Sequence, residues 1–322
     1  MREFGWRFSV IGLAAWAVMS GQTAPPATGP GKIMITEEKT DLKIEIDGKL
    51  FTLYRFAETA DDPEWQRPYF WPVQAADGTD VTSDQMRVFK QDPKTDHPHQ
   101  RSIWVGWGDV NGANHWTQSP EKERHVKFSK LDADGFVEEL MWDSKGSTVP
   151  VLSETRTVKV VAFADGSRGL DITSKFTAPT VDAVFKCKPL NVTGVESGIC
   201  SVRVAKAITD GPDAKKWITS GGGENPATGE AEARVKLETW CDYSGEIHGA
   251  KYGAAVVDYP KNPGGMTPWH VRLFGLLAHI GPLNWTLKKD DSATYRHLVI
   301  IHPGDAKDAK IDEKAKTWRE AK

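Results

Sequence analysis

The residues best suited to chemistry lie in the short segment 96–101, Asp-His-Pro-His-Gln-Arg. In an extended strand, residues two apart share a face, so His97, His99 and Arg101 would project together. Pro98 favours an extended backbone at the residue before it. Imidazoles suit proton transfer near neutral pH or metal ligation, and a guanidinium suits an oxyanion or a carboxylate. The spacing predicts a patch for such chemistry. The alternative is a surface strand whose histidines only hydrogen-bond to loops.

A second His-x-Arg pair, His270 and Arg272, lies far along the chain. On a strand these two share one face, while Trp269, Val271 and Leu273 take the other face and have the character of core. The polar pair therefore needs a cleft or solvent. Two such pairs on strands predict one shared site where the strands are neighbours, and coincidence is the alternative. We interpret three later histidines at strands or strand ends as structural: His279, His297 and His302.

Two carboxylates are candidates for a general base opposite these histidines. Glu196 precedes a predicted strand in the segment Val-Glu-Ser-Gly, where a short turn could aim it inward, and Asp109 follows Gly108 in a tight loop. A partly desolvated carboxylate has a raised pKa and can accept a proton. The alternative for each is turn capping, because Asp in a Gly-rich turn commonly hydrogen-bonds to its own backbone.

This chemistry requires no cofactor, but a divalent metal is a possible variant. The ligands would be His97 and His99 with either a carboxylate or His270. His-x-His alone is a weak metal motif.

Aromatic residues surround these polar groups. The chain has 13 Trp against 6 Tyr, and large amphipathic rings need a packing or binding reason. Flat rings beside polar groups suit a sugar, whose C–H faces stack while its hydroxyls form hydrogen bonds. The same rings also suit a β-sandwich core, and we expect about half of them to be core. The predicted substrate-binding residues are Tyr69, Trp71, Trp104, Trp107, Asn111, Trp116 and Trp269.

The elements that must position these residues follow a period of two along most of the chain. A hairpin is predicted over 42–54, with Asp47-Gly48 as its turn. Two loop-rich stretches, 57–98 and 208–230, interrupt the pattern, but strands of the same kind resume after each. The pattern predicts an all-β fold with one large antiparallel β-sandwich or barrel. Further predicted strands cover 125–131, 136–142, 151–163, 170–176, 198–207, 233–240, 254–258, 270–278 and 295–302.

The first 24 residues have the pattern of a secretory signal peptide. Arg2 and Arg7 precede the mostly apolar run 8–19, and small residues follow. The alternative is an uncleaved anchor, although the run is short for a membrane span. No later segment offers about 18 uninterrupted apolar residues, so an integral multi-span membrane protein is excluded. We expect an exported protein, periplasmic or extracellular, with no transmembrane span in the mature chain.

The composition excludes several further classes of protein. The 322 residues include 41 Lys+Arg and 44 Asp+Glu, and the net charge of −3 gives no general attraction to nucleic acid. Cys187, Cys200 and Cys241 are too few for a disulfide framework or a four-Cys zinc site. Export would permit one disulfide among them. The expected organisation is a signal peptide over 1–24, a flexible leader over 25–34, a β-sandwich domain over 35–306 and a charged tail over 307–322.

Several longer motifs resemble the PmoA-like family of exported bacterial proteins over roughly residues 35–320. They are Arg67-Pro68-Tyr69, the segment 96–112, Trp240-Cys241-Asp242-Tyr243-Ser244-Gly245, Pro268-Trp269-His270-Val271-Arg272 and His302-Pro303-Gly304-Asp305. The resemblance implies a β-sandwich related to the galactose-mutarotase-like supersandwich, in bacteria that degrade polysaccharides. The family takes its name from a methane monooxygenase subunit that is an integral membrane protein, so the name does not describe this chain's activity. Gln100 stands where the family often has another histidine, which argues against a mechanism that needs three histidines there.

Together these features predict an exported carbohydrate-active enzyme, either a glycoside hydrolase or lyase or a sugar isomerase, acting on a carbohydrate or small polar ligand. A histidine would donate or accept a proton, a carboxylate would act as the opposing base, and arginines would stabilise developing negative charge. The histidines are His97, His99 and His270, the carboxylates Glu196 and Asp109, and the arginines Arg101 and Arg272. The alternatives are a non-catalytic carbohydrate-binding module and an extracytoplasmic structural protein.

Overall fold

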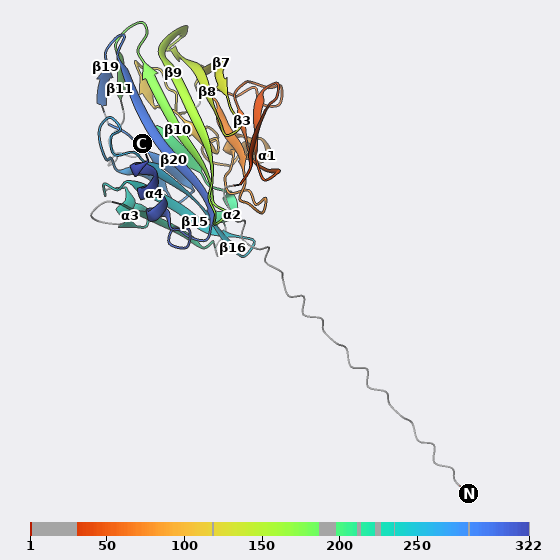
Figure 1. Cartoon of the computed structure of the whole chain (residues 1–322). Helices are drawn as coiled ribbons and strands as arrows, with labels where there is room; N and C mark the ends of the chain where they lie inside the picture. Colours follow the sequence, from red (N-terminus) through yellow and green to blue (C-terminus); the bar gives the residue numbers. More distant parts are fainter. Residues whose placement is uncertain are drawn as a thin grey trace.

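The computed structural model shows a β-rich body with few helices (Figure 1). It describes Met1 and residues 31–117, 119–186, 198–210, 214–222, 227–234, 236–282 and 284–321. Apart from Met1, the predicted signal peptide lies outside the described residues.

The strands of the described residues form three sheets. In spatial order, the eight-stranded sheet contains β1 (Ile33–Glu37), β2 (Asp41–Ile46), β3 (Lys49–Arg55), β4 (Tyr69–Val73), β5 (Ile103–Val105), β12 (Cys200–Arg203), β18 (Leu276–His279) and β17 (Trp269–Arg272). The nine-stranded sheet contains β14 (Ala227–Thr228), β13 (Lys216–Gly221), β15 (Trp240–Ile247), β16 (Ala250–Asp258), β20 (Ser292–Pro303), β10 (Arg168–Thr177), β9 (Ser147–Ala162), β8 (Gly135–Ser144) and β7 (Glu123–Leu131). The three-stranded sheet contains β19 (Asn284–Leu287), β11 (Ala183–Lys186) and β6 (Asp109–Val110).

All pairings within these sheets are antiparallel, and the two large sheets enclose the main apolar core, which confirms the predicted all-β antiparallel sandwich. Alternation of side chains along each strand fills that core. On β20, Tyr295, Val299 and Ile301 point into the core between the sheets, whereas Leu298 and Ile300 point to the opposite face. This parity also decides where the polar residues of each strand lie.

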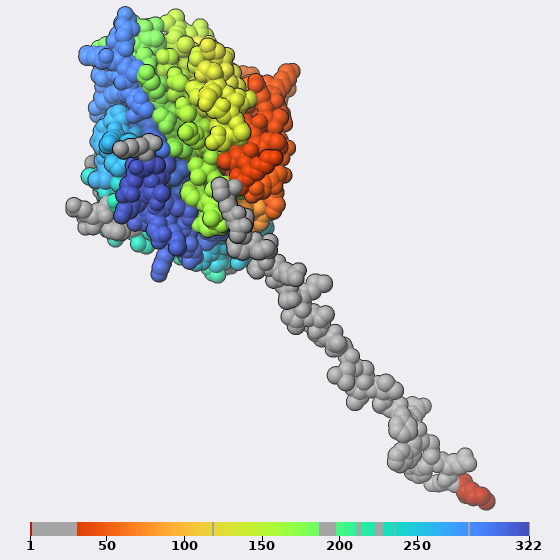
Figure 2. Space-filling model, in the orientation of Figure 1, coloured from red at the N-terminus to blue at the C-terminus, as the bar shows by residue number. Residues whose placement is uncertain are grey.

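Four helices occupy the described residues: α1 (Gln85–Gln91), α2 (Lys206–Thr209), α3 (Glu230–Ala233) and α4 (Ile311–Glu320). Figure 2 shows α4, in dark blue, on the outer surface of the nine-stranded sheet. Ile311, Ala315 and Trp318 of α4 pack in one apolar cluster with Leu298 and Ile300 of β20. The charged tail predicted from residue 307 therefore contains an amphipathic helix that covers the sheet. No helix in the described residues has the length and apolar character that a bilayer span requires.

Several strand predictions are confirmed, including the hairpin over 42–54, which becomes β2 and β3, and the long strands β9, β10 and β20. Others are wrong. Segment 233–240 contains the end of α3 and a loop, because the strand begins only at Trp240. The strand predicted over 270–278 is two strands joined by a turn at Gly275, whose φ of 103° favours glycine. Cys200 and Cys241 are buried free thiols, and Cys187 lies outside the described residues.

Candidate functional site

The outer face of the eight-stranded sheet, turned away from the main core, carries a row of paired residues from five strands. Tyr69 of β4 pairs with Trp104 of β5, which pairs with Ser201 of β12. Ser201 pairs with Ala278 of β18, which pairs with His270 of β17. Their neighbours along each strand, such as Phe70 and Val202, belong to the core. Sheet pairing therefore brings Tyr69, Trp104 and His270 to one face, although they are far apart in sequence.

Aromatic side chains fill this face. Trp116 reaches it from a loop, with its ring 5.0 Å from that of Trp104 and stacked 6.0 Å from that of His270. The aromatic cluster, as we call it, consists of Trp65, Tyr69, Trp104 and Trp116 with Leu276 and Ala278, and Trp71 and Phe274 pack against it. Trp104 and Trp116 are each 1% exposed. These two rings therefore shape the floor of the face and offer little surface for stacking on a ligand.

Arg101 is buried and already neutralised at the edge of the aromatic cluster. Its guanidinium pairs with Asp62 at 2.5 Å and with Asp84 at 2.6 Å, and it lies over the Tyr69 ring at 4.4 Å. The Tyr69 hydroxyl accepts from Arg101 and lies within donating distance of both carboxylates, at 2.9 Å from Asp62 and 3.0 Å from Asp84. Burial acts to raise the pKa of Asp62, but Arg101 outweighs it and holds that pKa below its usual value. Arg101 therefore orders this region, which differs from the predicted role of stabilising charge on a substrate.

The segment 96–100 forms a turn beside this network, which we call the histidine turn. The predicted strand over 97–101 is wrong, because His97 adopts a left-handed φ of 49° and its carbonyl accepts the Gln100 amide. Reversal of the chain nevertheless keeps the two histidines together, with the His97 and His99 rings 5.6 Å apart. Arg101 forms an isolated bridge with Asp84 at the end of the turn.

The His97 ring is held on two sides. Its Nδ1 lies 2.9 Å from Asp96, whose other oxygen accepts from Arg203 at 3.0 Å. The ring also stacks on Phe274 at 4.5 Å, and the Arg203 guanidinium lies over the same phenyl ring at 4.8 Å. Burial acts to raise the pKa of Asp96, but Arg203 and His97 keep it below its usual value. Asp96 thus remains a carboxylate that orients His97, with Nε2 directed away from it.

His99 lies deeper than His97. Burial, and after it the charge of Arg67, lowers the pKa of His99 from 6.5 to about 3, so this imidazole is neutral at physiological pH. It borders a small hollow in the surface beside the histidine turn. The hollow is lined by Glu64, Gln66, Arg67, Met86, Pro98, His99 and Arg101.

The second predicted cluster meets the histidine turn at the β17–β18 hairpin. His270 and Arg272 share the outer face as predicted, and Trp269 and Val271 belong to the core, which confirms the predicted alternation. Leu273 is an exception, since it lies in the hairpin turn and is 54% exposed. Phe274 of the same turn contacts His97. The two His-x-Arg segments thus share one face, but His270 lies on Trp116 while His97 lies on Phe274.

Other predicted residues lie elsewhere. Asp109 is in the three-stranded sheet and accepts from the Gly112 amide at 2.7 Å, which is the turn-capping alternative. Asn111 bonds to the backbone of Asp182 and Val184. Glu196 lies outside the described residues.

The predicted set of substrate-binding aromatic residues also needs correction. Trp107 and Trp269 are in the core between the sheets, because each falls on the inward parity of its segment. Trp71 lies on the outer face, and the guanidinium groups of Arg55 and Arg87 lie over its ring at 5.2 and 4.6 Å from the centroid. Two cations therefore already contact this ring.

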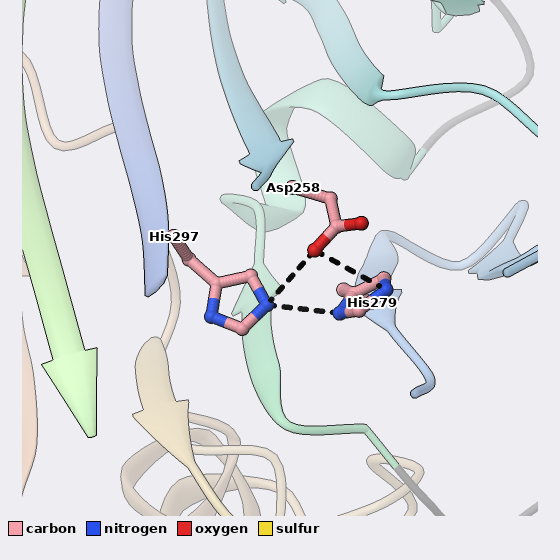
Figure 3. Close-up of side chains that lie close together, drawn as sticks. All are labelled: Asp258, His279 and His297. Carbon is pink, nitrogen blue, oxygen red and sulfur yellow. Dashed lines mark hydrogen bonds and ion pairs between the residues drawn. The ribbon is translucent and has the colours of Figure 1, made fainter. Parts of the chain in front are cut away.

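The predicted metal ligands do not form a metal group in the described residues. The one group there of at least three His, Cys, Asp or Glu with donor atoms within 4.8 Å of one another is Asp258, His279 and His297. Figure 3 shows these three side chains pointing toward one another. His279 Nδ1 lies 2.9 Å from His297 Nε2, and Asp258 Oδ1 lies 3.5 and 3.6 Å from His279 Nε2 and His297 Nε2. This core group, as we call it, could hold a metal.

Burial governs the protonation of the core group. It lowers the pKa of His279 and places that of His297 well below 6.5, so both imidazoles are neutral. Burial raises the pKa of Asp258, and His279 opposes that rise. The interpretation of both histidines as structural rested on their positions at strands or strand ends. The signal that could have found the group is parity, since Asp258 and His297 lie at inward-facing positions of predicted strands and His279 directly follows another.

Comparison with known proteins gives a family but no activity. The DUF6807 family, described as a family of unknown function, matches residues 41–316. The chain belongs to this family. No curated protein matches. The resemblance to the PmoA-like family is not tested by this match and stays a prediction.

Similar solved structures include a polysaccharide lyase, with 13% identity, 90% of this chain and 34% of that chain covered and a TM-score of 0.38. An alpha-galactosidase from Lactobacillus brevis has 10% identity and a TM-score of 0.37, with 85% of this chain and 40% of that chain covered. A galactose mutarotase related enzyme from Lactobacillus acidophilus has 8% identity and a TM-score of 0.33, with 84% of this chain and 97% of that chain covered. The chain thus spans 34–40% of the first two proteins. At these TM-scores the neighbours carry no argument about activity.

Proposed function

We propose that this chain is an exported carbohydrate-active enzyme, a glycoside hydrolase or lyase or a sugar isomerase, with its reaction centre at the histidine turn. One observation carries the proposal: the ordered series Arg203–Asp96–His97 beside a neutral His99. A carboxylate that holds Nδ1–H of an imidazole fixes its tautomer and leaves Nε2 as a base, as in other acid–base sites. The proposed chemistry uses no cofactor.

The two histidines take different roles in this proposal. The side chain of His97 is 41% exposed, so its Nε2 can reach a proton on a bound sugar. His99, being neutral and partly buried, would hydrogen-bond to a sugar hydroxyl at the hollow that it shares with Gln66 and Glu64. Acid–base catalysis of this kind contributes about 10²–10⁴-fold to a rate. The partly exposed Phe274 ring keeps His97 in place.

Burial of the tryptophans argues against the binding-module alternative in its original form. That alternative needs exposed ring faces, but Trp104 and Trp116 are each 1% exposed and Trp107 and Trp269 are in the core. Binding at the histidine turn remains possible through hydrogen bonds alone. The extracytoplasmic structural protein stays a second alternative, which predicts neither turnover nor saccharide binding.

A panel of oligosaccharides tests the proposal. Turnover and binding are measured for the wild type, for His97→Gln and for His248→Gln. His248 is a matched control, since it is also exposed and also adopts a left-handed φ, of 51°, but lies at the far end of β15. The proposal requires His97→Gln to abolish turnover while binding survives and His248→Gln changes neither. Unchanged turnover in His97→Gln refutes it, and binding without turnover in the wild type supports the binding module.

A further inference from the structure

The core group lies between the two large sheets and joins them. Asp258 and His297 are paired neighbours on β16 and β20 of the nine-stranded sheet, and His279 ends β18 of the eight-stranded sheet. All three take the inward parity of their strands, next to core residues such as Val256 and Leu277. Each of the three is at most 2% exposed. The sandwich therefore brings three potential metal ligands together in an apolar interior.

The Asp258 carboxylate forms no ion pair with a lysine or arginine among the described residues, and Arg319 acts on it from beyond ion-pair distance. Among the described residues, the basic groups within 4.0 Å of the Asp258 carboxylate are the imidazoles of His279 and His297 only. One carboxylate oxygen accepts from Asn262 at 2.7 Å, whereas the other, Oδ2, is buried without a hydrogen-bond partner. A buried carboxylate costs free energy unless an opposite charge or hydrogen bonds compensate it. A bound cation would supply that charge, and Oδ1 is the oxygen turned toward both imidazoles (Figure 3).

The surrounding hydrogen bonds orient the three residues as metal ligands. Thr267 Oγ1 lies 3.0 Å from His279 Nε2, which leaves Nδ1 facing His297 Nε2. Ligating histidines usually hold their second ring nitrogen in such a bond. Donors around a tetrahedral ion with bonds of about 2.0–2.1 Å lie about 3.3 Å apart. The observed separations of 2.9 Å between the imidazoles and 3.6 Å between Asp258 Oδ1 and His297 Nε2 bracket that value.

We propose that Asp258, His279 and His297 bind one divalent transition-metal ion, with zinc as the best match, and that this ion links the two sheets. Two imidazoles and a carboxylate suit zinc, whereas magnesium and calcium prefer oxygen ligands alone. Three protein ligands leave a fourth position for water. None of the three residues lines the hollow beside the histidine turn, so the ion stabilises the sandwich and takes no part in the proposed sugar chemistry. The proposal does not depend on that function.

The competing interpretation is a metal-free chain of hydrogen bonds from Thr267 through His279 to His297. The two interpretations predict different changes in melting temperature for one substitution. Asp258→Asn keeps the size of the side chain but removes its charge. It lowers the melting temperature if a cation is bound, because the ion is lost. It leaves the melting temperature unchanged or raises it if the carboxylate is merely buried and unbalanced.

The experiment uses the full chain without a polyhistidine tag. Metal content is measured by mass spectrometry after purification, after chelator treatment and after zinc is returned. We expect one zinc per chain, a fall in melting temperature on chelation and its recovery with zinc. Asp258→Asn should hold less than about a tenth of the wild-type zinc. Asp242→Asn is the matched control, because Asp242 is also a buried carboxylate paired with a histidine, His302, at 2.7 Å.

Two results overturn the proposal: a wild-type chain that binds no zinc before or after reconstitution, or an Asp258→Asn chain that binds zinc as well as Asp242→Asn does. Should Asp258→Asn fail to fold, Thr267→Val decides, since it removes only the hydroxyl that orients His279. Loss of such a partner weakens metal affinity by about 10–100-fold. An unchanged zinc affinity in Thr267→Val overturns the proposal in that case.

Discussion

Two groups of histidines in this protein are built in opposite ways. The histidine turn takes its histidines from one short segment and holds them at the surface, where the side chain of His97 is 41% exposed. The core group takes its members from three strands spread over 40 residues and buries them between the sheets. The first group is local and open to ligands, whereas the second exists only when both sheets have formed. Function and stability are therefore expected to separate between them.

The largest effect is expected on turnover in His97→Gln. This substitution removes the proposed base, so kcat on an accepted oligosaccharide should fall by about 100- to 10,000-fold. The free energy of unfolding should change by less than about 0.5 kcal/mol, because His97 is an exposed side chain. Kinetics and urea denaturation of the same preparation measure both quantities. A large loss of stability would show that the histidine turn is a structural element, which would contradict the proposed separation of function from stability.

The reverse pattern is expected in His297→Ala. Removing this buried side chain leaves the Asp258 carboxylate without one of its two imidazole neighbours and opens space in the core, so unfolding should become easier by about 3–5 kcal/mol. Turnover per folded molecule should stay within about twofold of the wild type, because residue 297 does not line the hollow at the histidine turn. Denaturant unfolding and active-site-normalised rates provide the measurements. A stability loss below about 1 kcal/mol contradicts a core group that links the sheets.

Acid sensitivity is expected from His99 in the histidine turn and from another buried histidine, His115, which lies in neither group. The pKa of His99 is lowered from 6.5 to about 3 and that of His115 from 6.5 to about 4, in each case chiefly by burial. Below pH 6.5 the unfolded chain binds protons at these residues while the folded chain does not, so stability is lost as the pH falls from 6.5 toward 4. Unfolding free energies measured between pH 7 and pH 4 should show this decline. His99→Gln should make the decline shallower, and an equally steep curve would contradict the lowered pKa.

The smallest effect is expected from Phe274→Leu, which tests the positioning of His97. Loss of the stacked ring at 4.5 Å should lower kcat by about tenfold, since misplacement of a catalytic group is costly even when the group remains. Leu273→Ala is the matched control, because Leu273 is adjacent in the same turn but 54% exposed. Both variants are assayed with the same substrate. Equal activities would remove Phe274 from the proposed site.

Local features, such as strands and the faces of their side chains, could be predicted from the sequence. Period-two alternation located β2, β3, β9, β10 and β20, because one face of each strand packs on the core. The same parity placed His270 and Arg272 on the face opposite Trp269. Residues two apart in one segment could thus be assigned to the same face of a strand without knowledge of the partner strands.

Features that depend on pairing between distant segments could not be predicted. Asp62 and Asp84 neutralise Arg101 from a loop-rich stretch that has no periodicity. The left-handed φ of His97 replaced a predicted strand with a turn, although Pro98 favours extended backbone before it. His279 and His297 looked structural because their partnership arises only when β18 and β20 face each other across the core.

The place of β20 in the sheet has a consequence for biosynthesis. β20 is the last strand along the described chain, yet it lies between β16 and β10 near the middle of the nine-stranded sheet. The two halves of the sheet on either side of β20 must therefore wait until residues 292–303 have been synthesised. Contacts of such long sequence separation slow folding and leave strand edges exposed in the meantime. This delay keeps the nine-stranded sheet incomplete until β20 has been synthesised.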